Sequence, residues 1–144
     1  MIDWSKIKHF APDEFDDPDF PDSHQYMNPK TIQMLDNLRD ETGWPIITHN
    51  KFGLRGCVCM NHEGHSPNSH HYYPYASAVD FHFKTDVDPR IQAMKVISFG
   101  FWGIGVYYDW NWKDENLPIG FHVDQRIRPQ IWKRENKKYT YLLK

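Results

Sequence analysis

The chain has 144 residues, a formal net charge of -2 with histidine counted as neutral, 40% hydrophobic residues and 16% aromatic residues. This length suits one domain, spanning 1–144, whose core is large enough to fold without disulfide bonds. The near-neutral charge argues against a nucleic-acid partner held through its phosphates. No apolar run has the length of a signal-peptide core or a membrane span, so we expect a chain made in the cytoplasm, with no membrane insertion. We also expect it to be a monomer.

An irregular arm is predicted for residues 1–30. It contains six acidic residues between positions 13 and 22 and four prolines, a composition that favours turns over long regular elements. Phe10, Phe15 and Phe20 are its apolar residues, and we expect them to anchor the arm to the rest of the domain.

Two helices are predicted from capping residues and apolar spacing. Asn28 precedes Pro29, apolar residues then recur on one face, and Gly43 ends the segment. A second helix is expected from Pro89 to about residue 99, capped by Asp88.

Strand patterns lie between and after these helices. The expected strands are 44–48, 76–83, 103–108 and 120–125, with short edge strands at 130–133 and 139–142. This order predicts an α+β fold with a mainly antiparallel central sheet and helices packed on one face.

Three residues in this pattern suit a metal ion. Asp80 and His122 lie in two strand segments of similar character, and His71 lies just before the first of them. Neighbouring strands would point all three side chains inward, and zinc accepts two imidazoles and one carboxylate while keeping a fourth position for water. An aspartate between apolar strand neighbours has little structural use, which favours a zinc site with one catalytic ion.

These residues resemble the motifs of the zinc D-alanyl-D-alanine carboxypeptidases and murein endopeptidases, including phage endolysins, over most of the chain. Ser69, His71, Ala78 and Asp80 match the anchor points of the first motif, and the segment 121–124, FHVD, is similar to the strand that carries the last zinc histidine. The resemblance implies the hedgehog and lysostaphin-type zinc fold, a zinc cofactor and a peptidoglycan stem peptide as substrate.

The same resemblance leaves the acid–base residue open. The family's carboxylate position three residues before the last histidine is Ile119 here, so Asp124 is the first alternative, either as the acid–base group or as a residue that orients a zinc ligand. Asp114 and Glu115 are further alternatives. The spacing from His71 to Asp80 is two residues longer than in the family, and His70 is an alternative ligand.

Two arginines and one serine complete the expected site. Arg55 is the candidate for stabilising developing negative charge or holding a substrate carboxylate, and Arg126 is an alternative. Ser69 and Arg126 are expected to contact substrate.

The segment 49–67 is a long loop rich in glycine and histidine. A second, structural metal site is an alternative within it, because Cys57, Cys59, His62 and His65 together supply four zinc ligands, two thiolates and two imidazoles. The one-residue separation of the cysteines excludes a useful disulfide between them and favours reduced thiols.

The sequence therefore predicts a zinc peptidase that cuts next to a D-amino acid in bacterial peptidoglycan, as a carboxypeptidase or endopeptidase, and acts on the cell wall as a phage or prophage lysis enzyme after release by a partner. A non-catalytic zinc-binding virion or assembly protein of the same fold is the main alternative. An HNH-type nuclease is a distant third, opposed by the charge balance.

Overall fold

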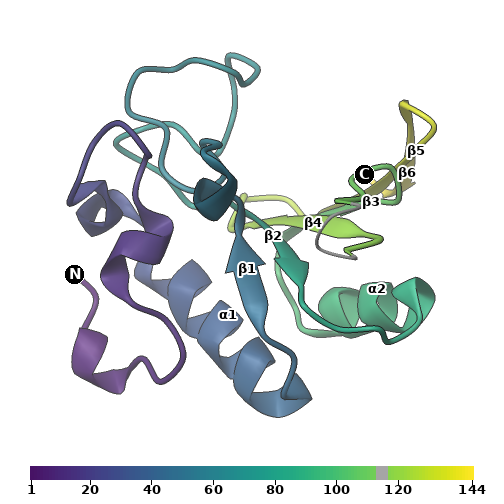
Figure 1. Ribbon diagram of the computed structural model, residues 1–144. Helices are drawn as coiled ribbons and strands as arrows, with labels where there is room; N and C mark the ends of the chain where they lie inside the picture. The colour runs from purple at the N-terminus through teal and green to yellow at the C-terminus, as the bar shows by residue number, and fades with distance from the viewer. Residues whose placement is uncertain (113–116) are drawn as a thin grey trace.

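A computed structural model describes residues 1–112 and 117–144 and has an α+β architecture (Figure 1). The described residues form helices α1 (Pro29–Thr42) and α2 (Pro89–Ser98) and strands β1 (Ile46–Thr48), β2 (Val79–Phe83), β3 (Gly103–Tyr107), β4 (Gly120–Asp124), β5 (Gln130–Glu135) and β6 (Lys138–Leu143). None of the helices in these ranges is long and apolar enough to cross a membrane.

Helix α1 begins and ends where the capping residues predict. The Asn28 side chain accepts the backbone N–H of Lys30, and Gly43 adopts the left-handed conformation, with φ of 69°, that closes the last turn. Helix α2 begins after Asp88, whose side chain accepts the N–H of Arg90. Both helix starts are confirmed.

The six strands form one mixed sheet in the order β1-β2-β4-β3-β5-β6. Strand β3 pairs in parallel with β5, and the other four neighbouring pairs are antiparallel. Strand β5 lies between β3 and β6, so the expectation that it forms an edge was wrong, whereas β6 is an edge strand.

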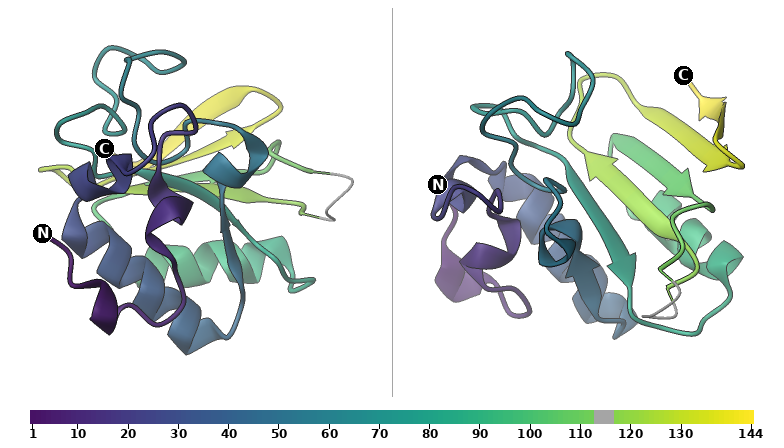
Figure 2. Two further views of the ribbon diagram at one scale, coloured as in Figure 1. Left: turned by 60° about the vertical axis from the view of Figure 1, so that its left-hand side comes forward. Right: turned by 45° about the horizontal axis from the view of Figure 1, so that its top comes forward.

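The two faces of the sheet have different chemistry because side chains alternate along each strand. Val79, Phe81 and Phe83 of β2 are buried in the core that α1 and α2 also line. Both helices lie against this one face, as Figure 2 shows. The alternate residues of β2, Asp80 and His82, lie on the opposite face, which carries the candidate site.

The N-terminal arm consists of 3-10 turns η1 (Trp4–Lys6), η2 (Pro12–Phe15) and η3 (Ser23–Tyr26) joined by irregular backbone. Phe10 and Phe15 are buried in the core, as expected. The expectation for Phe20 was wrong, because its side chain is 41% exposed. Asp36 of α1 also holds the arm, since its carboxylate accepts the backbone N–H groups of Lys8 and His9.

A long connection between β1 and β2 rises on the side of the sheet away from the helices (Figure 1). It starts with the turn η4 (His49–Phe52) and continues without strands or helices to residue 78. It carries His71 and supplies many of the residues that line the pocket around the site.

Candidate metal centre

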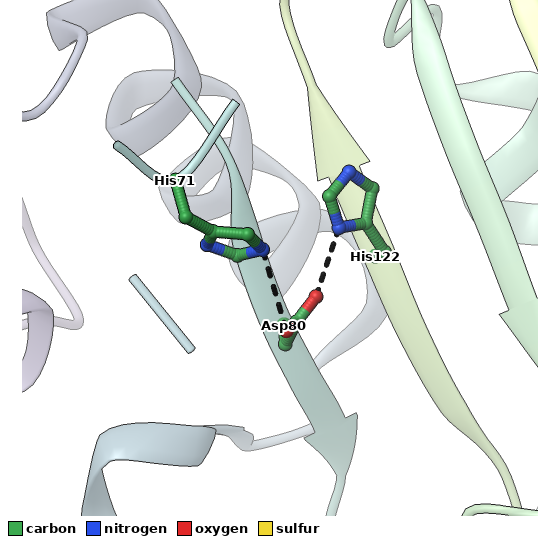
Figure 3. A group of neighbouring side chains, drawn as sticks. All are labelled: His71, Asp80 and His122. Atoms are coloured by element: carbon green, nitrogen blue, oxygen red, sulfur yellow. Dashed lines mark hydrogen bonds and ion pairs between the residues drawn. The ribbon is translucent and has the colours of Figure 1, made fainter. Parts of the chain in front are cut away.

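His71, Asp80 and His122 converge on the sheet face opposite the helices (Figure 3). Asp80 and His122 are direct partners in the antiparallel pairing of β2 with β4, so the sheet register brings their side chains together. One ligand atom from each of the three residues lies within 4.8 Å of the others. This buried group can hold a metal ion.

The closure of the loop before β2 places His71, rather than His70, in the group of possible metal ligands. The backbone N–H groups of Ser77 and Ala78 both donate to the carbonyl of His70, which gathers the intervening residues into a closed turn. This turn contains residues 71–76, most of the stretch between His71 and Asp80. The His71 ring is left buried, with Nε2 at 3.3 Å from Asp80 Oδ2.

Each histidine of the triad uses its second ring nitrogen to hold its orientation. His71 Nδ1 donates to the carbonyl of Cys57 at 2.9 Å, which leaves Nε2 facing the centre. His122 Nε2 donates to Asp124 Oδ2 at 2.8 Å, which leaves Nδ1 facing Asp80 Oδ1 at 2.9 Å. Histidine ligands of metal ions in proteins are commonly fixed by such outer hydrogen bonds.

The electrostatics of the centre favour a bound cation. Burial opposes the charged form of Asp80, but His71 and His122 hold the pKa of its carboxyl well below the usual value. Burial also opposes protonation of His122, yet hydrogen bonds to Asp124 and Asp80 raise its pKa to about 9. Without a metal ion, a protonated imidazole thus lies between two carboxylates, and a metal ion bound at Nδ1 would take the place of that positive charge.

Asp124 is fully buried, and each of its two carboxylate oxygens accepts two hydrogen bonds. Besides His122, its two oxygens accept from Arg126 Nε at 2.9 Å, Arg126 Nη2 at 2.5 Å and the Arg126 backbone N–H at 3.0 Å. Burial opposes its charge, but the bonds from Arg126 and His122 keep the pKa of Asp124 far below its usual value. Of the two roles expected for Asp124, the geometry suits orienting a ligand better than accepting a proton.

The triad lies in a pocket of about 890 Å³ whose lining includes Arg55, Ser69 and Arg126. Arg55 is turned to the arm, with Nη2 at 2.5 Å from Asp19. Ser69 Oγ accepts the backbone N–H of His71 at 3.2 Å. The Arg126 guanidinium also bonds to Gln130 and lies 4.8 Å from the Trp132 ring. Whether these three side chains contact a substrate stays a prediction.

Asp114 and Glu115, the other acid–base alternatives, lie outside the described residues.

The second metal site considered for the long loop is not assembled in the described part of the chain. His71, Asp80 and His122 form the group of ligand side chains found there. Cys57 Sγ instead lies near the carbonyl of Glu14, and Cys59 Sγ near the carbonyl of Glu63. Burial raises the pKa of both thiols, which fits reduced, unreactive cysteines.

Sequence reasoning missed a pair of buried histidines beside the triad. His49 Nε2 and His82 Nδ1 lie 2.7 Å apart, and both rings are buried. The available signal was the position of His82, which shares a strand face with Asp80. Nothing in the sequence around His49 marked it, because its loop has no regular pattern.

Comparison with known proteins gives no match, since no protein-family model, curated protein or solved structure matches this chain. The geometry of the triad and its surroundings is therefore the support for a metal centre.

Proposed function

We propose that this chain is a zinc-dependent peptidase that hydrolyses a peptide bond next to a D-amino acid in the stem peptide of bacterial peptidoglycan. One observation carries the proposal: three ligand atoms from His71, Asp80 and His122 converge in the lining of a pocket. The motif resemblance supplies the substrate class.

The residues present fit zinc better than a hard cation. Two imidazole nitrogens and one carboxylate oxygen form the ligand set of many catalytic zinc sites, whereas calcium and magnesium prefer oxygen ligands alone. His71 would bind through Nε2 and His122 through Nδ1, because their other nitrogens already donate to Cys57 and Asp124. When bound, zinc would lower the pKa of water toward about 7 and polarise the scissile carbonyl.

The other residues of the pocket would bind and orient the substrate. Stem peptides carry carboxylates, and the pocket includes the guanidinium groups of Arg55 and Arg126. Arg126 also orients Asp124, which holds the His122 ring. The proposal includes a hedgehog-like zinc fold with a mainly antiparallel sheet, supported by the placement of Asp80 and His122 on neighbouring antiparallel strands.

The decisive experiment incubates the zinc-loaded protein with purified muropeptides and searches for new termini by mass spectrometry. We expect cleavage next to a D-amino acid, as carboxypeptidase or endopeptidase products, and no cleavage by the His122→Ala variant. A zinc-loaded protein that leaves both linear and cross-linked muropeptides intact would contradict the proposal.

A second candidate is a non-catalytic zinc protein with the same fold, acting as a virion or assembly component. The observation in its favour is Ile119, a buried apolar residue at the position where the resembling peptidases carry their carboxylate. Bound zinc without hydrolysis of any muropeptide would favour this candidate.

A further inference from the structure

Two buried histidines lie beside the triad and take no part in binding the proposed metal ion. His49 is the first residue of η4, directly after β1, and His82 is on β2, two residues beyond Asp80. Their exposed fractions are 3% and 0%. The rings are stacked with centroids 4.8 Å apart, and the side chains are joined by the 2.7 Å contact between His49 Nε2 and His82 Nδ1.

The hydrogen-bond partners fix the direction of this contact. His82 Nε2 lies 2.6 Å from the carbonyl oxygen of Trp110. A carbonyl only accepts, so Nε2 of His82 carries a hydrogen, and in the neutral ring Nδ1 is then an acceptor. His49 must therefore donate through Nε2, which leaves its Nδ1 without a hydrogen.

The surroundings keep both rings neutral. No carboxylate is bonded to either ring among the described residues. Burial lowers the pKa of His49 to about 4, and the fully buried His82 ring is held between His49 and the Trp110 carbonyl. Around His49 lie the rings of Phe52, Trp110 and Trp112, with centroids 5.1 to 5.9 Å away. This aromatic surround leaves the imidazole little freedom to turn.

His49 lies in the wall of the pocket, beside one of the triad residues. Its side chain lines the same pocket as the three triad residues. In the register of β1 with β2, Thr48 is opposite Phe81, so the next residue along, His49, comes beside Asp80. Gly56 separates the two side chains, because a Cβ on that glycine would clash with His49 Cβ and lie 3.4 Å from Asp80 Cβ.

We propose that His49 is the catalytic proton acceptor of the hydrolysis, an inference that rests on the proposed peptidase function. Its Nδ1 takes a proton from the attacking water while the water oxygen bonds to the carbonyl carbon of the scissile peptide. The same proton passes to the amide nitrogen as the C–N bond breaks, and His49 returns to its starting form. His82 is a positioning residue. Its bond to the Trp110 carbonyl makes its Nδ1 an acceptor, so that His49 carries its hydrogen on Nε2 and its Nδ1 stays free of hydrogen.

The alternatives in the described pocket are less suited to this role. Both oxygens of Asp124 are occupied by His122 and Arg126. Glu63 lines the pocket, but its side chain is 69% exposed and lies near Arg55. His65 also lines the pocket and donates from Nε2 to the Arg55 carbonyl, which leaves its Nδ1 as an acceptor, but its side chain is only partly buried. His49 combines full burial beside Asp80 with a defined acceptor atom.

The first test measures kcat on purified muropeptides and zinc content for the full zinc-loaded chain. We expect His49→Ala and His49→Gln to retain zinc and to lower kcat by about 10²- to 10⁴-fold. His9→Gln is the matched control, since His9 pairs with Asp40 at the surface. Unchanged kcat in both His49 variants, or loss of zinc in parallel with activity, would overturn the role of His49, as would a loss of this size in Glu63→Gln alone.

Two variants of His82 separate positioning from packing. Glutamine at this position offers an oxygen that accepts from His49 and an N–H that donates to the Trp110 carbonyl, so His82→Gln should keep kcat within a few-fold of the unaltered protein. His82→Leu removes both bonds and should lower kcat. Equal losses in the two variants would overturn the positioning role.

A readout without turnover is the protonation pattern of the His49 ring. We expect ¹⁵N NMR of the zinc-loaded protein, with the His49→Gln spectrum used for assignment, to show hydrogen on Nε2 and none on Nδ1. Hydrogen on Nδ1 would overturn the inference. If the unaltered protein cuts no muropeptide, the proposed function falls and the catalytic role with it; if it cuts them and the His49 variants cut equally well, only the role of His49 falls.

Discussion

Replacing Asp124 by asparagine tests whether this residue orients a zinc ligand or carries out proton transfer. The carboxylate accepts from His122 on one side and from Arg126 on the other. Asparagine has only one oxygen, so its NH₂ group must face one of these donors. The His122 ring should lose its fixed orientation, or the Arg126 guanidinium its partner.

The expected size follows from the place of Asp124 behind His122. Loss of an outer partner of a histidine ligand costs about 10- to 100-fold in metal affinity, or roughly 1.4 to 2.7 kcal/mol. Competition with a chromophoric zinc chelator measures this change directly. Asp109→Asn is the matched control, because Asp109 also pairs with an arginine, Arg134, but contacts no triad residue in the described structure.

Two outcomes would refute this account of Asp124. Zinc affinity equal to that of the unaltered protein would show that the bond to His122 does not support the metal centre. Full zinc occupancy with hydrolysis abolished would instead assign Asp124 the acid–base role.

Three further predictions concern stability and the shape of the site. Because burial lowers the pKa of His49 and His82 to about 4, the unfolded chain alone takes up their protons below pH 6.5. The free energy of unfolding should therefore fall as the pH is lowered from 6.5 to 4, by on the order of 3 kcal/mol for each histidine. Urea titrations of the His82→Gln variant should show a smaller fall than those of the unaltered protein. Equal pH dependence in the variant and the unaltered protein would contradict this prediction. Gly103→Ala places a Cβ against the Asp124 carboxylate and should weaken zinc binding in the chelator assay, whereas unchanged affinity would show that the site tolerates the shift. Asp36→Ala removes the acceptor of two backbone N–H groups in the arm and should cost about 1 to 3 kcal/mol in urea unfolding; a loss below about 0.5 kcal/mol would contradict its anchoring role.

Features controlled by local chemistry could be predicted from the sequence. Asn28 and Gly43 mark the ends of α1 because capping depends on side chains within a few residues. The face assignment of β2 follows from alternation, which separates Asp80 from the apolar residues on either side. To predict that Asp80 and His122 face each other, we also had to expect that their strands are neighbours. The antiparallel pairing of β2 with β4, in which the two residues are direct partners, confirms that expectation.

Features that depend on distant contacts could not be predicted in this way. His49 and His82 are 33 residues apart and meet only because β1 pairs with β2 and the chain then turns into η4. The interior place of β5 depends on a parallel pairing with β3 that no local pattern indicates. Phe20 resembles the buried Phe15 in sequence, but the turn that carries it leaves its ring exposed.

The zinc content of the purified protein tests the central claim most directly. Elemental analysis should find about one zinc ion per chain in the unaltered protein and none in His122→Ala, and added zinc should raise the melting temperature of the unaltered protein alone. Absence of zinc in the unaltered protein, together with a melting temperature that added zinc does not change, would contradict a metal centre formed by His71, Asp80 and His122.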